Sequence, residues 1–582
     1  MKNIKYILPA ILGLMIFSSC KKFLDKSPLD KLTAEQAFAS ENTMQLYINS
    51  FYNNMLPDGP GIYQGDVTAD ITVPNAVPAY IGINYSAQNA GGWSWGNLRN
   101  INYFLENYNN PAVAEKARNH FAGIARFFRA YFYFNMVKQF GDVPWYGKTL
   151  TIDDPDLYKK QDSRTLVMDS ILSDINFACD NIYATKDNSA TQVTKWVALA
   201  LKSRIALFEG TFRKYHSELG LLSTADVWFQ ASADAAKLLM ESNQYKLQNT
   251  GVPEKDYRSL FISENPVANE VLLAAVYNNS LKKWHNAAWW YNSATLGNRL
   301  GLAKLFINTY LNRDGSRFTN TPGFDTMQFQ NEVKNRDRRL EQTIRMGAYK
   351  RTDGSPAPPD FTVTYSGYQI QKFSLDDKYF DTRTESYNSI PIMRYAEVLL
   401  NYAEAKAELG TLSAADWSAT IGLLRSRAGI TNIAMPATPD PYLQTNFFPG
   451  VSDALILEIR RERGIEYAAE GYRYDDLKRW KAGKLLEKPY MGIYIPGKGQ
   501  LLDLNEDGKY DVCFVDALPA IRVPGVTYFI LDNNTSRLSE GSKGNLLWLS
   551  NTPKNFADKK YFAPIPPNEI NLNPNLSQNK DW

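Results

Sequence analysis

Apolar residues recur at steps of three and four through long segments of this chain, the spacing that places side chains on one face of a helix. In the segment 117–140, Phe121, Ile124 and Phe128 share one face, and Gly141 then ends the helix. The same spacing predicts further helices at 165–179, 194–209, 226–241, 394–409, 414–428, 453–469 and 472–482. Because these helices follow one another in antiparallel pairs, the pattern predicts a mainly α, tetratricopeptide-like scaffold, although no clean 34-residue repeat is visible.

Between the helices lie long stretches with little periodicity, at about 54–92, 242–300, 311–392 and 484–560. They are rich in Gly, Pro, Asn and Tyr, and short alternating runs such as 361–365 predict minor β hairpins. Loops of this length in a compact domain are either functional or hold small hairpins, and binding surfaces sit on loops that a rigid scaffold supports. We therefore look for a ligand site in these insertions.

The amino terminus has the layout of a bacterial lipoprotein signal. Lys2 and Lys5 precede an apolar run at 7–17, which ends in two serines and Cys20. We expect residues 1–19 to be a signal peptide, Cys20 to carry lipid, and residues 20–45 to form an anchor and tether that leads into a helix capped by Thr33. The body, 46–582, divides into an N-terminal helical part (46–241), a loop-rich insertion (242–392) and a C-terminal helical part with its own loop-rich segment (393–582).

Composition narrows the classes of function. The formal net charge is only +3 over 582 residues and no basic block stands out, which disfavours nucleic-acid binding. Aromatic residues make up 13% of the chain, with 12 Trp and 35 Tyr, and exposed rings suit sugar faces or protein partners. Beyond Cys20 the chain has Cys179 and Cys513, and the sequence leaves open whether they pair.

Several segments, in order along nearly the whole chain, resemble one family. They are CKKFLD from Cys20, ARFFRAYFYFNMVKQFGDVPW at 125–145, IMRYAEVLLNYAEA at 392–405, RER at 461–463 with EGYRYDDLKRW at 470–480, and the closing PIPPNEINLNPNLSQNKDW at 564–582. Together they are similar to the SusD/RagB family of outer-membrane lipoproteins for nutrient uptake and polysaccharide utilisation. The resemblance implies a cell-surface, lipid-anchored protein that captures an oligosaccharide and delivers it to a SusC-like TonB-dependent transporter, without catalysis.

Taken by themselves, the charged residues of these motifs are mostly structural. Arg394 and Glu397 flank a buried stripe, so we expect each to pair at a helix interface. Glu458 with Arg461, and Arg463 with Glu466, are three apart on one helix and would each stabilise it by about 0.2–0.5 kcal/mol.

Catalytic motifs are weak. The run 92–96, GWSWG, matches the nucleophile-elbow pattern, but residues 86–91 are small and polar and offer no buried strand to feed it. His120, His216 and His285 are the only histidines and form no compact metal-binding pair. Since no pair of carboxylates is singled out either, a surface hydrolase is the least favoured reading.

One segment resembles the start of a calcium-binding loop. Asp503, Asn505, Asp507 and Asp511 fit positions 1, 3, 5 and 9 of an EF-hand-like loop, with Gly508 at position 6. Position 12 falls on Phe514, so the bidentate Glu is missing; Asp516 could substitute from slightly further on. A structural calcium ion and a solvated Asn/Asp/Gly turn are the two interpretations, and no other cofactor is expected.

Glycan-binding residues combine aromatic faces, which stack on the C–H patches of sugars, with polar groups at the edges. The densest such run is 284–292, where we predict ligand contacts from Trp284, Trp289, Trp290, Tyr291 and Asn292; a core cluster is the alternative. A second candidate is the pair Trp93 and Trp95, and the preceding loop could add Asp70, Asn75 and Tyr80. The other function that the sequence leaves open is a transporter lid whose cargo is a peptide or another non-glycan molecule.

Overall fold

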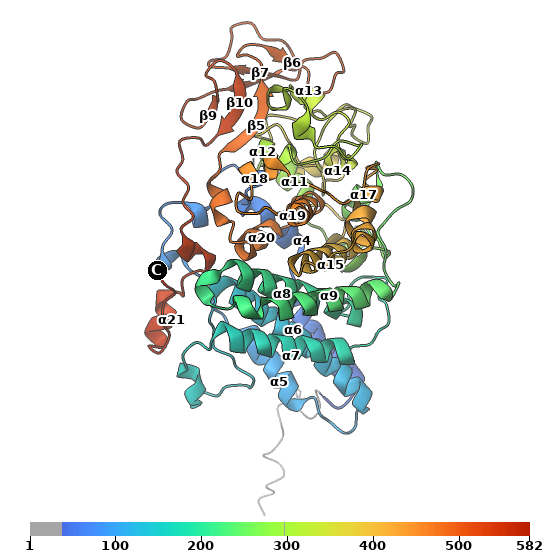
Figure 1. Cartoon of the computed structure of the whole chain (residues 1–582), viewed down its shortest axis with the longest axis vertical. Coiled ribbons are helices and arrows are strands. Elements are labelled where there is room, and N and C mark those ends of the chain that lie inside the picture. Colours follow the sequence, from blue (N-terminus) through green and yellow to red (C-terminus); the bar gives the residue numbers. More distant parts are fainter. Residues whose placement is uncertain (1–37, 296) are drawn as a thin grey trace, which may run out of the picture.

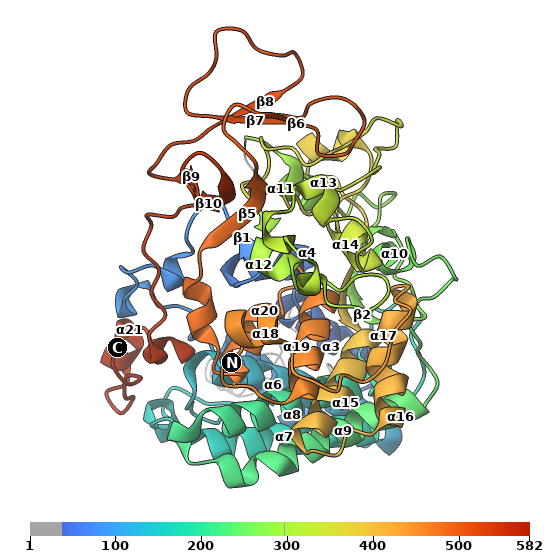
Figure 2. The same ribbon diagram turned by 45° about the horizontal axis from the view of Figure 1, so that its top comes forward.

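The computed structural model describes residues 38–295 and 297–582. Long helices stack in layers through one half of the molecule, and the short helices and small sheets of the loop-rich segments cover the other half (Figure 1). The sheet made of β6, β7 and β8 lies at the extremity farthest from the layered helices (Figure 2). This arrangement is the predicted mainly α scaffold with loop-rich insertions and minor β structure.

The helices of the scaffold are α3 (Glu41–Met55), α5 (Gly96–Asn107), α6 (Glu115–Phe140), α7 (Arg164–Asn181), α8 (Lys195–Tyr215), α9 (Ala225–Glu241), α15 (Tyr395–Glu408), α16 (Ala414–Trp417), α17 (Leu423–Arg427), α19 (Ala454–Glu466) and α20 (Arg473–Arg479). Shorter helices are α4 (Gly59–Tyr63), α10 (Asp256–Ile262), α11 (Ala287–Asn292), α12 (Lys304–Ile307), α13 (Phe329–Glu332), α14 (Arg338–Thr343), α18 (Pro441–Asn446) and α21 (Pro567–Leu572). The predicted helices are all present, α8 continues six residues beyond its predicted end, and a π-helical turn (Ser418–Gly422) joins α16 to α17.

Within residues 38–295 and 297–582, ten short strands form four small sheets. The strands are β1 (Thr72–Val73), β2 (Val271–Ala275), β3 (Gly301–Leu302), β4 (Ile390–Arg394), β5 (Tyr490–Ile495), β6 (Leu501–Leu502), β7 (Val512–Val515), β8 (Thr527–Ile530), β9 (Ser536–Leu538) and β10 (Gly544–Trp548). β1 pairs with β3 and β2 with β4, both antiparallel, while β5–β10–β9 and β6–β7–β8 are three-stranded. Because β1 and β3 are far apart in the sequence, their pairing brings the 74–90 loop to the end of the 284–300 segment.

Helix α6 shows why the scaffold is rigid. Fifteen of its 26 residues are buried, because α3 and α5 pack on one side of it and α7 on another. Gly141 ends the helix with φ of +80°, a conformation that strains any residue with a Cβ, and a Cβ there would lie 3.1 Å from the Phe562 ring. The tail that contains Phe562 is thereby fixed against the end of α6.

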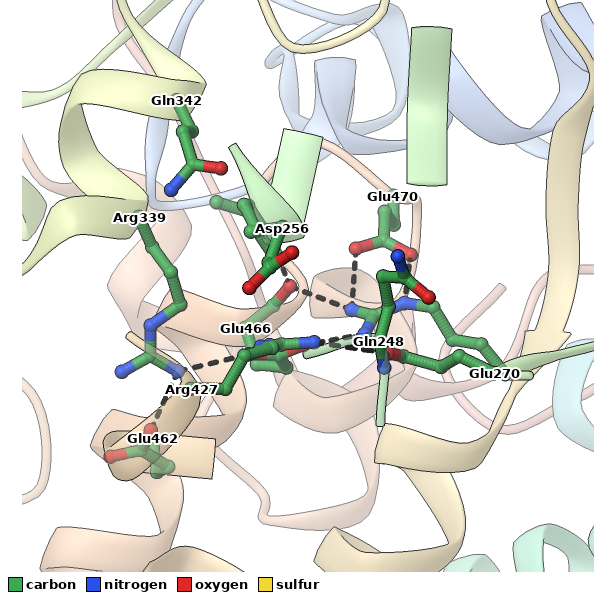
Figure 3. A network of polar contacts seen from close by, with 12 residues as sticks. Gln248, Asp256, Glu270, Arg339, Gln342, Arg427, Glu462, Glu466 and Glu470 are labelled. Atoms are coloured by element: carbon green, nitrogen blue, oxygen red, sulfur yellow. Dashed lines mark hydrogen bonds and ion pairs between the residues drawn. The ribbon is translucent and has the colours of Figure 1, made fainter. Parts of the chain in front are cut away.

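A buried network of charges joins the helical half to the loop-rich half (Figure 3). Glu466, near the end of α19, accepts from Arg394 at 2.5 Å, from Arg427 at 2.6 Å and from Arg339 at 2.9 Å. These arginines also pair with Glu462, Glu470 and Glu270. Burial alone would raise the pKa of Glu466, but the surrounding guanidinium groups hold it well below its usual range.

The network corrects one predicted ion pair. Arg463 does not pair with Glu466 but donates to Asp476 on α20 at 2.9 Å. The predicted Glu458–Arg461 pair does form, at 2.9 Å. The periodicity of one helix could not show that arginines from three other elements surround Glu466. As expected for Arg394 and Glu397, each pairs across an interface: Glu397 accepts from Arg204 on α8 at 2.5 Å.

Several predictions concern residues outside the described part of the chain. The signal peptide, Cys20 and the Thr33 cap lie there; within the described part, α3 begins at Glu41 with Ser40 as its cap. Cys179 and Cys513 do not pair: each is a buried free thiol. None of the described helices combines the length and the apolar character that a membrane span requires.

Candidate functional site

The aromatic run 284–292 divides between core and surface. Trp284, Trp289 and Trp290 are half-buried, whereas Tyr291 and Asn292 are buried on the inner side of α11. Their role as ligand contacts stays a prediction. With no exposed ring surface, Tyr291 offers no face to a sugar in this conformation. The half-buried indoles remain the better candidates from this run.

The two buried residues anchor α11 instead. Tyr291 donates its hydroxyl to the carbonyl of Tyr63 at 2.6 Å. The Asn292 side-chain oxygen accepts from Arg345 at 2.9 Å and from Gln369 at 3.0 Å. These bonds fix the helix against the core of the loop-rich half, and so they position the chain that follows it.

Beyond α11, residues from three separate loops and from the end of β10 meet in what we call the aromatic patch: Asn75, Asn298, Arg299, Tyr365 and Trp548. The Asn298 amide donates to Asn75 at 3.4 Å, and the Arg299 guanidinium donates to the Tyr365 hydroxyl at 2.7 Å. The rings of Tyr365 and Trp548 stack with centroids 3.7 Å apart and planes at 10°. Asn75 is exposed and the other four are half-buried.

The backbone of the 74–78 loop is tied directly to this patch. The Trp548 indole N–H donates to the carbonyl of Pro74 at 3.0 Å, at the end of β10. The β1–β3 pairing, with Thr72 opposite Leu302, fixes the loop from its other side. Flat rings beside amide and guanidinium groups, mounted on strand ends, are the combination that binds the apolar faces and the hydroxyl edges of sugars.

Of the predicted ligand residues, only Asn75 belongs to the aromatic patch. Sequence reasoning missed Asn298, Arg299, Tyr365 and Trp548. Tyr365 ends the alternating run 361–365, for which the predicted β hairpin was wrong: these residues form turns and bends. Trp548 lies in a segment where no pattern indicated a neighbour, because its partners are hundreds of residues away.

The second predicted pair lies elsewhere. Trp93 and Trp95 line a pocket of about 460 Å³ between the start of α5, the 144–158 loop and α21. Trp93 is only 9% exposed and packs its ring on Phe140 at 4.9 Å, while Trp95 is half-buried against Tyr146 at 5.3 Å. Trp95 is therefore the more accessible of the two, and its ligand role also stays a prediction.

Asp70 and Tyr80 occupy two further environments. The Asp70 carboxylate accepts two hydrogen bonds from Arg473 on α20, at 2.7 and 2.9 Å, and its side chain has no exposed surface. This pairing is structural. Tyr80 donates to the carbonyl of Lys560 at 2.6 Å and lines a separate cavity, which we call the tyrosine cavity.

The acidic loop 503–511 forms a turn held by its own carboxylates. Asp503 accepts from the backbone N–H of Glu506 at 2.6 Å and of Gly508 at 2.9 Å, and Asp511 accepts from that of Leu504 at 2.7 Å. Burial, with the nearby charges of Asp503 and Asp507, raises the pKa of Asp511 to about 6. Across the described residues, no three His, Cys, Asp or Glu side chains are grouped as a metal site. Calcium stays a prediction.

The histidines lie apart and serve packing. His120 stacks on Tyr183 at 3.8 Å, His216 stacks on Phe212 at 3.8 Å, and His285 is buried beside the 386–388 backbone. No strand precedes the GWSWG run among the described residues 86–96, so the backbone of a nucleophile elbow is missing there.

The chain is thus a layered helical scaffold that carries a group of rings and amides on its loops and at the end of β10. Residues 269–582, more than half of the chain, match the family described as the SusD family, and residues 22–207 match the family described as starch-binding, associating with the outer membrane. The chain belongs to the SusD family.

Named relatives are similar in sequence, and solved structures share the fold. The SusD-like protein P38 of Formosa agariphila is 23% identical over 84% of this chain and 94% of its own length. The SusD-like protein P25 of the same organism is 26% identical over 34% of this chain, a match that spans 42% of P25. A SusD-like protein of Bacteroides fragilis, 22% identical, superposes with a TM-score of 0.68 over 96% of this chain and all of its own. A SusD-like carbohydrate binding protein of the same species is 21% identical, with a TM-score of 0.67 over 93% of this chain and all of its own.

Proposed function

We propose that this protein is a glycan-binding lipoprotein of the outer membrane, which captures an oligosaccharide at the cell surface and delivers it to a SusC-like TonB-dependent transporter. Family membership supports the role, and the aromatic patch is the single structural observation that carries the sugar chemistry. Binding would be non-catalytic: the patch offers ring faces and hydrogen-bond donors but no carboxylate or histidine.

The charge of the patch favours a neutral or weakly acidic glycan. Arg299 is its only cation, and its Nη1 is already engaged by the Tyr365 hydroxyl. A second guanidinium nitrogen donates to the carbonyl of Ala294. A peptide cargo would call for a clamp on its terminal carboxylate, and the five residues of the patch do not form one. The lid with non-glycan cargo is therefore the second candidate.

The test is isothermal titration of the purified protein against plant, host and microbial oligosaccharides. We expect saturable binding that weakens at least about fivefold in Trp548→Ala, since truncating a stacked aromatic anchor costs upwards of about 1 kcal/mol. Trp289→Ala and Trp290→Ala test the α11 indoles, and Trp95→Ala tests the separate pocket. Trp196→Ala, which removes a half-buried indole on α8, is the matched control.

Each outcome assigns the site. Loss in Trp548→Ala with full binding in Trp95→Ala places the glycan on the aromatic patch. The reverse places it in the α5 pocket. No binding to any oligosaccharide, together with binding of peptides, would contradict the glycan proposal and support the lid.

A further inference from the structure

The tyrosine cavity is a hollow of about 460 Å³ between the 65–85 loop, the C-terminal end of α6 and α20. Three half-buried tyrosines line it. The ring of Tyr80 lies 4.8 Å from that of Tyr85 and 6.2 Å from that of Tyr474, both edge-on. Tyr80 itself is fixed by its bond to the Lys560 carbonyl, so the wall is rigid.

The polar residues that line the cavity include a side chain whose hydrogen-bonding groups are available to a ligand. Asn135, on α6, makes no side-chain hydrogen bond to any residue that the structure describes, and it lines both this cavity and a smaller neighbouring one. Next to it, Lys138 pairs with Asp475 at 2.5 Å. Lys478 also lines the cavity, and its ammonium donates to the Lys138 carbonyl. An amide, an ion pair and a hydrogen-bonded ammonium beside aromatic rings suit the hydroxyl groups of a neutral ring-shaped ligand.

The cavity and the aromatic patch are linked through the chain, although none of the five patch residues lines the cavity. Asn75 and Tyr80 belong to one loop, and five extended residues span at most about 18 Å. The chain from Trp548 to Lys560 runs along that loop, bonded to Pro74 at 3.0 Å, to Ile81 at 2.8 Å and to Gly82 at 3.1 Å. The patch and the cavity are therefore held at a fixed separation.

We propose that the tyrosine cavity is a second carbohydrate subsite, which takes one neutral sugar residue of the same glycan whose other residues stack on the aromatic patch. This inference rests on the proposed glycan function. It gives Tyr474 and Asp475, within the signature segment 470–480, a role in ligand recognition in addition to their place in the scaffold. It also predicts that long oligosaccharides bind more tightly than short ones.

The experiment measures affinity along a ladder of chain lengths of an oligosaccharide that the wild-type protein binds. We expect affinity to rise with length in the wild type. Tyr85→Ala and Asn135→Ala should weaken the long members about fivefold and leave the short ones unchanged, whereas Trp548→Ala weakens every length. Tyr510→Ala, which removes an exposed ring far from the cavity in sequence, is the control for Tyr85→Ala.

Asn135→Ala protects the test against misfolding, because it removes no hydrogen bond and alanine favours helices. Length-independent affinity in the wild type, or wild-type affinity for long chains in both cavity variants, would overturn the second subsite and leave the glycan function intact. A wild-type protein that binds no glycan would overturn the proposed function and this inference together.

Discussion

At the scale of single residues, the chemistry of this protein depends on partners that are remote in the sequence. Tyr365 and Trp548 stack, and Asn75 meets Asn298, although each pair joins different insertions. Asp70, which looked like a ligand group beside Asn75, is instead fully committed to Arg473. The type of residue indicated which interactions each side chain can make. Its neighbours in the fold decided which of these interactions it makes.

The loop of Asp503 to Asp511 gives a prediction at this scale. The raised pKa of Asp511, about 6, means that the folded state binds more protons than the unfolded one between about pH 4 and 6. The free energy of unfolding therefore falls as pH rises through that window. In calcium-free buffer, we expect Asp511→Asn to raise stability by about 1 kcal/mol at pH 7.5 and to have no effect at pH 4.

Calcium reverses this expectation if the loop binds it. Added calcium should then raise the thermal unfolding temperature of the wild-type protein at pH 7.5 and leave that of Asp511→Asn unchanged. Equal responses of the two proteins to calcium would favour the solvated turn. Asp325→Asn, on an exposed carboxylate outside the loop, is the control.

At the scale of elements, α19 is where the two halves of the molecule are joined. Its Glu466 is wholly buried among three guanidinium groups. Glu466→Gln removes the charge that compensates them and should lower the free energy of unfolding by about 3–5 kcal/mol, measured by chemical denaturation. Glu540→Gln, which affects an exposed pair with Lys543, should change it by less than about 1 kcal/mol. Equal losses in the two variants would contradict the role of the buried network.

At the scale of the whole molecule, anchoring at the membrane follows from the proposed lipoprotein signal. We expect Cys20→Ser to abolish lipidation and to move the protein from the membrane fraction to the soluble fraction, measured by fractionation and by mass spectrometry of the mature N-terminus. Cys179→Ser, on a buried thiol of α7, should keep the protein in the membrane fraction. A Cys20→Ser protein that stays in the membrane fraction would show that contacts other than the lipid are enough to hold it at the membrane.

The helical scaffold followed from the sequence because its information is local. The three- and four-residue spacing of apolar side chains placed α6, α7 and α9 to within two residues at each end. The glycine at position 141 marked the end of α6, and the structure gives the reason, a φ of +80°. The motifs at 125–145, 392–405 and 470–480 identified the family. The helices could be predicted without knowledge of tertiary contacts, because the spacing of apolar residues along one helix is a local property of the sequence.

The candidate site required the tertiary structure, because four insertions supply its residues and a single pairing, β1 with β3, brings two of them together. In the run 284–292, aromatic density indicated a platform, yet the turn of α11 buries Tyr291 and leaves the two indoles half-exposed. In a segment without periodicity, the sequence does not predict which side chains of different loops contact one another. The scaffold was therefore determined by local pattern, and the binding surface by long-range packing.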